Sequence, residues 1–192
     1  MTLALKEWHV VSEAIARGDQ VLTLRKGGIR EKAFAVPGAT FWLYPTWEHQ
    51  RAAEVKRAWK GELARSNRER RTDGRIPIRC HCELAASWEV TDPGLLEQLD
   101  RWHLWSPEYA ASRLAWRPGK PLAVLLLRAA ALLDPYPIDN SAAYEGCRSW
   151  VELDEEPAGR LVPSLTDEAF TRRAALIGEL LGAPTPELAT AR

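Results

Sequence analysis

Three short segments of the sequence combine charged, aromatic and turn-forming residues, a mixture that could bind or transform a ligand. They are residues 25–31, 44–50 and 144–150. Each lies where a strand or helix is expected to end, and binding and catalytic residues are often found in such connections. Because a buried charge without a partner is costly, we expect the three segments to meet in one cleft at the sheet edge. Its predicted lining comprises Arg25, Arg30, Glu48, His49 and the turn at residues 147–150.

The first segment predicts an anion-binding site. Gly27 and Gly28 are typical of a two-residue hairpin turn, which would place Arg25 opposite Arg30. Two facing arginines repel each other unless an anion or carboxylate lies between them, and arginine binds phosphate or carboxylate through two parallel hydrogen bonds. The alternatives are an internal ion-pair network or two arginines that point apart into solvent. The predicted ligand-binding residues here are Arg25, Lys26, Gly27, Gly28 and Arg30.

The second segment contains the candidate acid–base residues. Glu48 and His49 are expected in the first turn of a helix capped by Thr46. A carboxylate beside an imidazole suits proton transfer near neutral pH. With Glu31 they form the candidate catalytic set. Glu31 and Glu48 could bind a divalent metal ion at a phosphoester, with Lys26 beside it to neutralise the charge of the phosphoryl group. The alternative is that Glu48 has no catalytic role and only interacts favourably with the helix dipole. The residue order typical of metal-dependent nucleases is absent, which argues against a nuclease.

The third segment adds a cysteine, an arginine and a tryptophan. Cys147 could act as a nucleophile with a histidine as its base, and a buried structural cysteine is the alternative. Aromatic side chains beside Arg and Lys would stack on the bases of single-stranded nucleic acid, whereas the alternative for the nine tryptophans is a place in the core. Trp47, Cys147, Arg148 and Trp150 complete the predicted ligand-binding set.

The segment Cys80-His81-Cys82 resembles a metal site only at first sight. Residues 76–84 alternate between apolar and polar, which predicts a strand with one buried face. The two thiols would then point to one face and the imidazole to the other, so they could not complete one tetrahedral site. We expect Cys80 and Cys82 to be small buried residues and predict no metal ligands.

Composition and charge limit the class of protein. The chain has 192 residues, 46% of them hydrophobic, and no stretch of about 18 apolar residues that would cross a membrane. Residues 1–17 carry charges throughout rather than a signal-peptide core, and three cysteines form no disulfide framework, so we expect a cytoplasmic protein without membrane association. The net charge is zero, but residues 1–80 hold 16 Lys and Arg against nine Asp and Glu. This asymmetry indicates either an anion-binding face or two halves that attract each other.

Hydrophobic periodicity and turn residues predict the elements that position these segments. The expected strands are residues 21–25, 41–44, 76–84, 122–127 and 147–153, the fourth of them central and buried on both faces. The expected helices are residues 3–17, 47–64, 92–105, 106–116 and 166–181, the last of them ended by Gly182. A polar loop or hinge is expected at residues 65–75, and a disordered tail at residues 183–192.

Strands that alternate with helices predict an α+β or α/β fold. We expect one globular domain over residues 1–182, with a single mixed sheet of about five to seven strands flanked by helices.

The order of these segments resembles a bacterial family known as domain of unknown function number 1802. The resemblance spans roughly residues 3–155 and implies no particular activity. Cys80-His81-Cys82 departs from the family pattern, which argues against a metal site common to the family. The matching residues are 5–8, 24–31, 44–46, 48–50, 105–109, 120–128 and 146–153. Gly18, followed seven residues later by Arg25, is similar to a feature of RNA-associated ASCH domains, but the Lys and Thr found between them there are absent.

We therefore expect a protein that binds an anionic, phosphate-bearing ligand, such as a nucleotide or nucleic acid, at the Arg/Lys-Gly-Gly segment. Two alternatives remain open: a metal-dependent phosphoester hydrolase or nuclease, and a structural or protein-interaction module without a small-molecule site. The sequence indicates neither a cofactor nor an oligomeric state.

Overall fold

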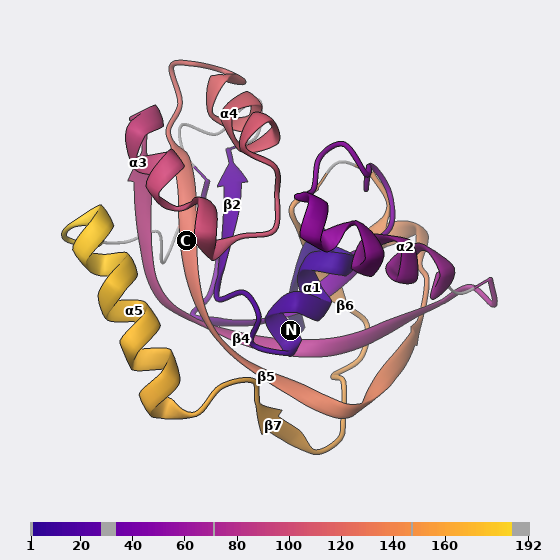
Figure 1. Ribbon diagram of the computed structural model, residues 1–192. Coiled ribbons are helices and arrows are strands. Elements are labelled where there is room, and N and C mark those ends of the chain that lie inside the picture. The colour runs from indigo at the N-terminus through magenta and orange to yellow at the C-terminus, as the bar shows by residue number, and fades with distance from the viewer. Residues whose placement is uncertain (1, 28–33, 71, 147, 186–192) are drawn as a thin grey trace.

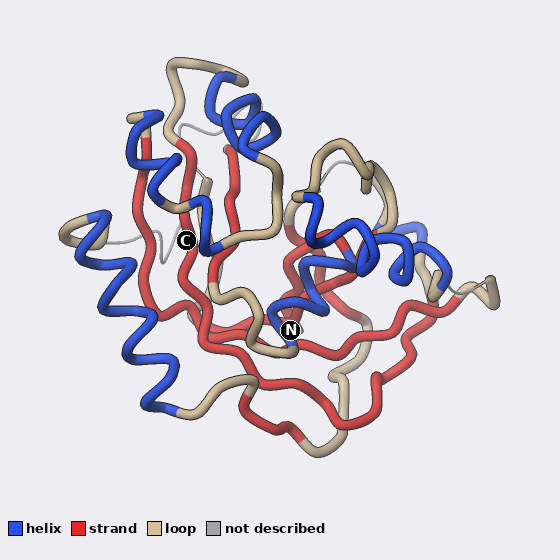
Figure 2. The backbone as a smooth tube through the Cα atoms, viewed as in Figure 1, coloured by secondary structure: helices blue, strands red, loops and turns tan. Residues whose placement is uncertain are grey.

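Two long antiparallel strands run through the whole molecule. In the computed structural model, which describes residues 2–27, 34–70, 72–146 and 148–185, β4 (Arg75–Val90) pairs with β5 (Leu122–Asp139) along almost its full length. The register shifts twice, between Ile78 and Cys80 and between Leu84 and Ala86. Such irregularities bend a strand and increase its twist, and both strands are strongly curved (Figures 1 and 2).

The remaining strands extend this pair into one curled, mixed sheet. Its order is β2-β5-β4-β3-β1-β6, with β7 paired to β5. β1 and β3 are parallel, and all other pairs are antiparallel. The predicted fold class, a mixed sheet of about five to seven strands flanked by helices, is confirmed. The additional strands are β1 (Thr2–Trp8), β2 (Leu22–Lys26), β3 (Thr40–Thr46), β6 (Trp150–Leu153) and β7 (Leu161–Pro163).

Helix starts with a local capping signal lie where the sequence predicts them. The side chain of Asp92 accepts a hydrogen bond from the Gly94 amide at 2.9 Å, and Ser106 and Thr166 cap their helices in the same manner. Gly182, with φ of 75°, ends the last helix as predicted. The helices are α1 (His9–Ala16), α2 (Lys60–Arg68), α3 (Pro93–Gln98), α4 (Pro107–Ala115) and α5 (Asp167–Leu181).

The predicted helix at residues 3–17 is wrong in its first half, which forms strand β1. Ala4 and Leu5 are both fully buried, and β1 lies between β3 and β6 in the sheet. Backbone pairing on both sides outweighs the helical spacing of the apolar residues, because long-range pairing overrides local propensity.

The predicted helix at residues 47–64 is wrong over residues 47–56, whereas residues 57–64 are helical, first as a 3-10 turn at Arg57–Trp59 and then as α2. β3 continues through Thr46, whose hydroxyl donates to the Glu7 carbonyl at 3.3 Å and therefore does not cap a helix. Residues 47–56 form turns, and α2 begins only at Lys60 and ends within the expected polar loop at Arg68.

Three other boundaries differ from expectation. The helix that begins at Pro93 ends at Gln98 rather than near residue 105. β5 runs through Pro135 and Pro137 to Asp139, and the late strand begins at Trp150. Pro137 pairs with Pro77 in the β4–β5 ladder. The predicted disordered tail falls mainly on residues 186–192, outside the described residues, and the Thr185 amide donates to the Ser87 carbonyl at 2.8 Å.

Cys80 and Cys82 are buried on the same face of β4, as predicted, with 1% and 0% of their surfaces exposed. Their sulfur atoms lie 3.7 Å apart as free thiols, and burial raises the pKa of Cys82. His81 lies on the opposite face, where its ring meets that of Trp42 edge-on at 5.0 Å. Within the described ranges, none of the helices has the length and apolar character that crossing a bilayer requires.

Candidate functional site

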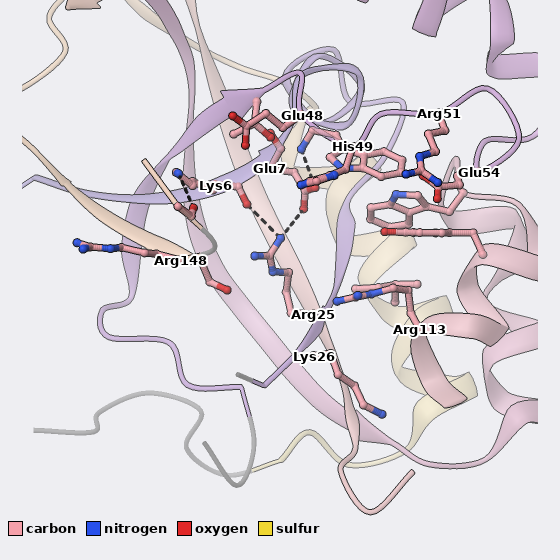
Figure 3. A pocket seen from close by; sticks show the side chains of 17 residues that line it. Lys6, Glu7, Arg25, Lys26, Glu48, His49, Arg51, Glu54, Arg113 and Arg148 are labelled. Atoms are coloured by element: carbon pink, nitrogen blue, oxygen red, sulfur yellow. Dashed lines mark hydrogen bonds and ion pairs between the residues drawn. The ribbon is translucent and has the colours of Figure 1, made fainter. Parts of the chain in front are cut away.

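An open cavity of about 450 Å³ lies at the ends of β1, β2 and β3, beside α4 (Figure 3). Because β1 and β3 are parallel, the residues at their C-terminal ends lie at the same end of the sheet. The cavity brings together residues from all three polar segments of the sequence. The first contributes Arg25 and Lys26, the second Glu48 and His49, and the third Gly146, Arg148 and Ser149.

A buried carboxylate, Glu7, forms the floor of this cavity. Glu7 is 5% exposed, and its Oε2 atom accepts hydrogen bonds from the Thr23 hydroxyl at 2.5 Å and from Arg25 Nη1 at 3.4 Å. Its Oε1 atom accepts from the Trp8 amide at 2.8 Å. β1 and β2 are separated by three strands in the sheet order, so these side chains meet across the inside of the curled sheet.

Arg25 is held in place by several contacts. Besides Glu7, its Nη1 atom donates to the Lys6 carbonyl at 3.1 Å, and its guanidinium lies 5.4 Å from the centre of the Phe34 ring. The side chain is 17% exposed and points into the cavity (Figure 3). A guanidinium has five donors, and only Nη1 is used in these hydrogen bonds. Arg25 is therefore a pre-oriented cation with further donors for a ligand.

Positive charge dominates the walls. Among the described residues, six Lys or Arg side chains and three glutamates line the cavity. Arg113, from α4, points toward Arg25, whereas the head of Arg148 lies on the side away from Arg25 (Figure 3). Lys6 donates to the Gly146 carbonyl at 3.1 Å and so connects β1 to the third polar segment. Such a surface attracts an anion.

Lys26 lines the cavity, but its amino group has another task. Its Nζ atom donates to the carbonyls of Leu114 at 2.8 Å and Lys120 at 2.6 Å, just where α4 ends. The last carbonyls of a helix lack partners within the helix, and a cation there is favourable. Burial lowers the pKa of Lys26. Lys26 thus fixes α4, and with it Arg113, beside the cavity.

Of the remaining residues of the first segment, the structure describes only Gly27. The Gly27 carbonyl accepts from Arg117 Nη1 at 3.5 Å. Gly28, Arg30 and Glu31 lie outside the described residues, as does Cys147. The facing pair Arg25–Arg30 and the roles of Glu31 and Cys147 therefore stay predictions. In the described ladder, Arg25 is opposite Ala123 of β5.

Aromatic side chains form one wall of the cavity. The rings of Trp8 and Tyr109 lie 5.2 Å apart, and Trp105 lies beside them with 3% of its surface exposed. Burial raises the pKa of Tyr109. Sequence reasoning missed Glu7 and Trp8, since it expected residues 3–17 to be helical, and it missed Tyr109 because no local signal places α4 beside this cavity. A strand ending at Trp8 would have placed Glu7 and Trp8 at the sheet edge.

The turn that carries Glu48 and His49 is tied to α1 and α2 by neighbouring residues. The Trp47 ring stacks on the His9 ring at 4.5 Å, and its indole nitrogen donates to the Ser66 carbonyl at 2.8 Å. His9 Nδ1 and the Ser66 hydroxyl share a hydrogen bond of 2.8 Å, and burial lowers the pKa of His9 to about 4. His49 itself has φ of 64°. A non-glycine residue in this region is uncommon and is often found at functional sites.

Both tryptophans of the predicted ligand-binding set, Trp47 and Trp150, lie outside this cavity. Trp150 donates its indole N–H to the Ala35 carbonyl at 2.9 Å and meets Phe41 edge-on at 5.0 Å, so it packs in the core. Trp47 lines a second, adjoining cavity. In the part of the chain that the structure describes, no three His, Cys, Asp or Glu side chains gather as a metal site, and the predicted set that includes Glu31 is not tested.

The chain is similar to known proteins at the level of family and of distant structure. The crystal structure of ASCH from Zymomonas mobilis is 16% identical with a TM-score of 0.43, over 91% of this chain and 94% of that one. A mutant of the same protein is 18% identical with a TM-score of 0.44, over 91% and 95%. No curated protein matches the sequence.

The model of one protein family matches residues 4–176, which is most of the chain and includes every described residue that lines the cavity. The match also covers the three polar segments whose order suggested the resemblance. The chain belongs to the family described as domain of unknown function (DUF1802).

Proposed function

We propose that the protein binds a phosphate-bearing ligand, a nucleotide or nucleic acid, in the cavity between β1, β2, β3 and α4. One observation carries this proposal: two arginines, the pre-oriented Arg25 and Arg113, line the same cavity, and Arg113 points toward Arg25. A ligand gains most from cations that are already ordered, because less conformational entropy is lost on binding. Phosphate oxygens match the planar donor fork of arginine.

The aromatic wall supports a ligand that carries a ring as well as a charge. Trp8 and Tyr109 are half-buried and line the cavity next to Arg113, which follows Tyr109 by one helical turn on α4. Stacking of a base on such rings is sequence-tolerant and stabilises binding, and Arg adds a cation–π contribution. A free inorganic anion would use only the arginines.

Binding of a fluorescent mononucleotide tests the proposal. Replacing Arg113 by alanine removes one cation without touching the Glu7–Arg25 contacts, and we expect affinity to fall on the order of tenfold. Arg172→Ala, an exposed residue of α5 that lines neither cavity, is the matched control and should bind normally. Equal affinity in both variants would argue against the cavity as the binding site.

The second candidate function is phosphoester hydrolysis by Glu48 and His49. It is favoured by the unusual backbone of His49, which lines a cavity rich in Lys and Arg side chains. Phosphodiester and phosphomonoester substrates should be screened with Mg²⁺ or Mn²⁺. Turnover that Glu48→Gln abolishes at unchanged thermal stability would support a hydrolase, and binding without turnover would leave the protein a binder.

A further inference from the structure

A second cavity of about 500 Å³ adjoins the first. The two share four lining residues: Lys6, Thr46, Glu48 and Gly146. The two cavities are therefore neighbours that meet at residues near the C-terminal ends of β1 and β3. Each cavity has the volume of a typical small-ligand site, so together they exceed what one mononucleotide needs.

The second cavity has its own ordered aromatic ring, Trp47. One face of this ring stacks on His9, and the indole nitrogen donates to the Ser66 carbonyl. The ring is thus fixed before any ligand arrives, while the residue remains half-exposed and lines the cavity. A base that stacked on Trp47 would not have to order it.

Cations accompany this second ring. Arg70 and Arg75 line the cavity and are exposed. Arg75 pairs with Asp139 at 3.5 Å, but both side chains are more than half exposed, so the pair is weak and can exchange for a phosphate. Lys6 lies between the two cavities, with its ammonium group 5.7 Å from the centre of the Tyr44 ring. Each cavity thus combines aromatic side chains with at least two arginines, and Lys6 lies between the two cavities.

We propose that the second cavity is a subsite for the neighbouring nucleotide of the same strand, so that the ligand is a single-stranded oligonucleotide rather than a mononucleotide. The inference rests on the function proposed above and adds Trp47, Arg70 and Arg75 to the binding surface. A single-stranded oligonucleotide alternates rings and charges along its chain, whereas an acidic peptide has the charges without the rings.

A length series of oligouridylates and oligodeoxythymidylates tests this inference, with uridine monophosphate and thymidine monophosphate as the shortest members. Affinity should rise on the order of tenfold from the mononucleotide to the tetranucleotide, because a second base stacks and further phosphates are bound. The double variant Arg70→Ala/Arg75→Ala should remove most of this gain and leave mononucleotide binding unchanged. Arg113→Ala should weaken both, and Arg172→Ala neither. Comparison of the two series shows whether the sugar is recognised.

Three results would overturn the inference. Mononucleotide binding without any gain from length would refute the second subsite and leave the proposed function intact. A gain from length that survives the double variant would place the longer ligand elsewhere. Equal binding of a polyaspartate peptide would show that charge alone is recognised. Failure of every nucleotide and oligonucleotide to bind would instead refute the proposed function itself.

Discussion

At the scale of single residues, the site depends on Glu7, which holds the charged and polar groups of β2 in position. Its carboxylate accepts hydrogen bonds from Thr23, Arg25 and the Trp8 amide, so each of these contacts requires an acceptor. Glutamine has nearly the same shape but presents an amide with two donors on one side. At least one donor of the network would then face another donor in a buried place.

We predict that Glu7→Gln lowers the free energy of unfolding by about 1–3 kcal/mol, the cost of leaving buried hydrogen-bonding groups unpaired. Urea denaturation measures the change. Glu152→Gln on β6, where the side chain is exposed, is the control and should stay within about 0.5 kcal/mol of the wild type. A loss no larger than that of the control would show that the Glu7 contacts contribute little to stability.

The buried His9 predicts a pH dependence of stability. Its pKa is lowered to about 4 in the folded protein, chiefly by burial, whereas the ordinary value in the unfolded chain is about 6.5. Between these values the unfolded state binds the proton and the folded state does not, so stability is lost as the pH falls from about 6.5 to 4. The linkage amounts to about 3 kcal/mol at the lower end.

His9→Asn should remove this part of the slope, although the variant is less stable at pH 7 because the stacking with Trp47 is lost. The measurement is the difference in unfolding free energy between the two proteins at pH 7 and at pH 4.5. His49→Asn removes an exposed imidazole from a position that asparagine tolerates well, and it should keep the wild-type slope. Identical slopes for wild type and His9→Asn would refute the role of His9.

At the scale of elements, helix α4 is held in position by a residue of strand β2. Lys26 of β2 donates to the carbonyls of Leu114 and Lys120 at the end of the helix. The same helix presents Tyr109 and Arg113 to the cavity. The Gly-Gly segment thus contributes to the site through its lysine, although as support for a helix rather than as a ligand contact.

We predict that Lys26→Met destabilises the protein by about 1–3 kcal/mol and speeds amide hydrogen exchange in α4 more than in α5. The methionine fills a similar volume but cannot satisfy the two carbonyls. Lys60→Met, at the exposed start of α2, should change neither quantity. Exchange that accelerates equally in α4 and α5 would mean that Lys26 supports the whole fold and not this helix.

Elements with a local signal could be predicted from the sequence, and elements that depend on distant partners could not. Asp92, Ser106 and Thr166 each cap a helix within their own few residues, and the caps were identifiable without any knowledge of the fold. β1 has no such signal, because its strand conformation is stabilised by ladders to β3 and β6, more than 30 residues away in sequence. The misassigned helix concealed Glu7 and Trp8 from the predicted site.

At the scale of the whole molecule, the convergence of three polar segments could be argued from the cost of unpaired charge alone. Arg25, Glu48, His49 and Arg148 do line one cavity. The sequence could not supply Tyr109 and Arg113, since nothing local indicates that α4 packs beside β2. Part of the excess of basic residues in the first part of the chain lies around the two cavities. These residues are Lys6, Arg25, Arg51, Arg70 and Arg75.

The meeting of β1 and β2 across the curled sheet has a mechanical consequence. The two strands touch through the side chains of Glu7, Thr23 and Arg25, although three strands lie between them in the sheet order. The sheet therefore resembles an open ring, with its gap between β1 and β2. The first cavity lies over this gap, since residues of both strands line it. A ligand that contacts Lys6 of β1 and Arg113 of α4, beside β2, would bridge this gap and make the curled sheet more rigid. Slower amide exchange in both β1 and β2 on nucleotide binding, with β6 as the internal reference, would reveal this effect.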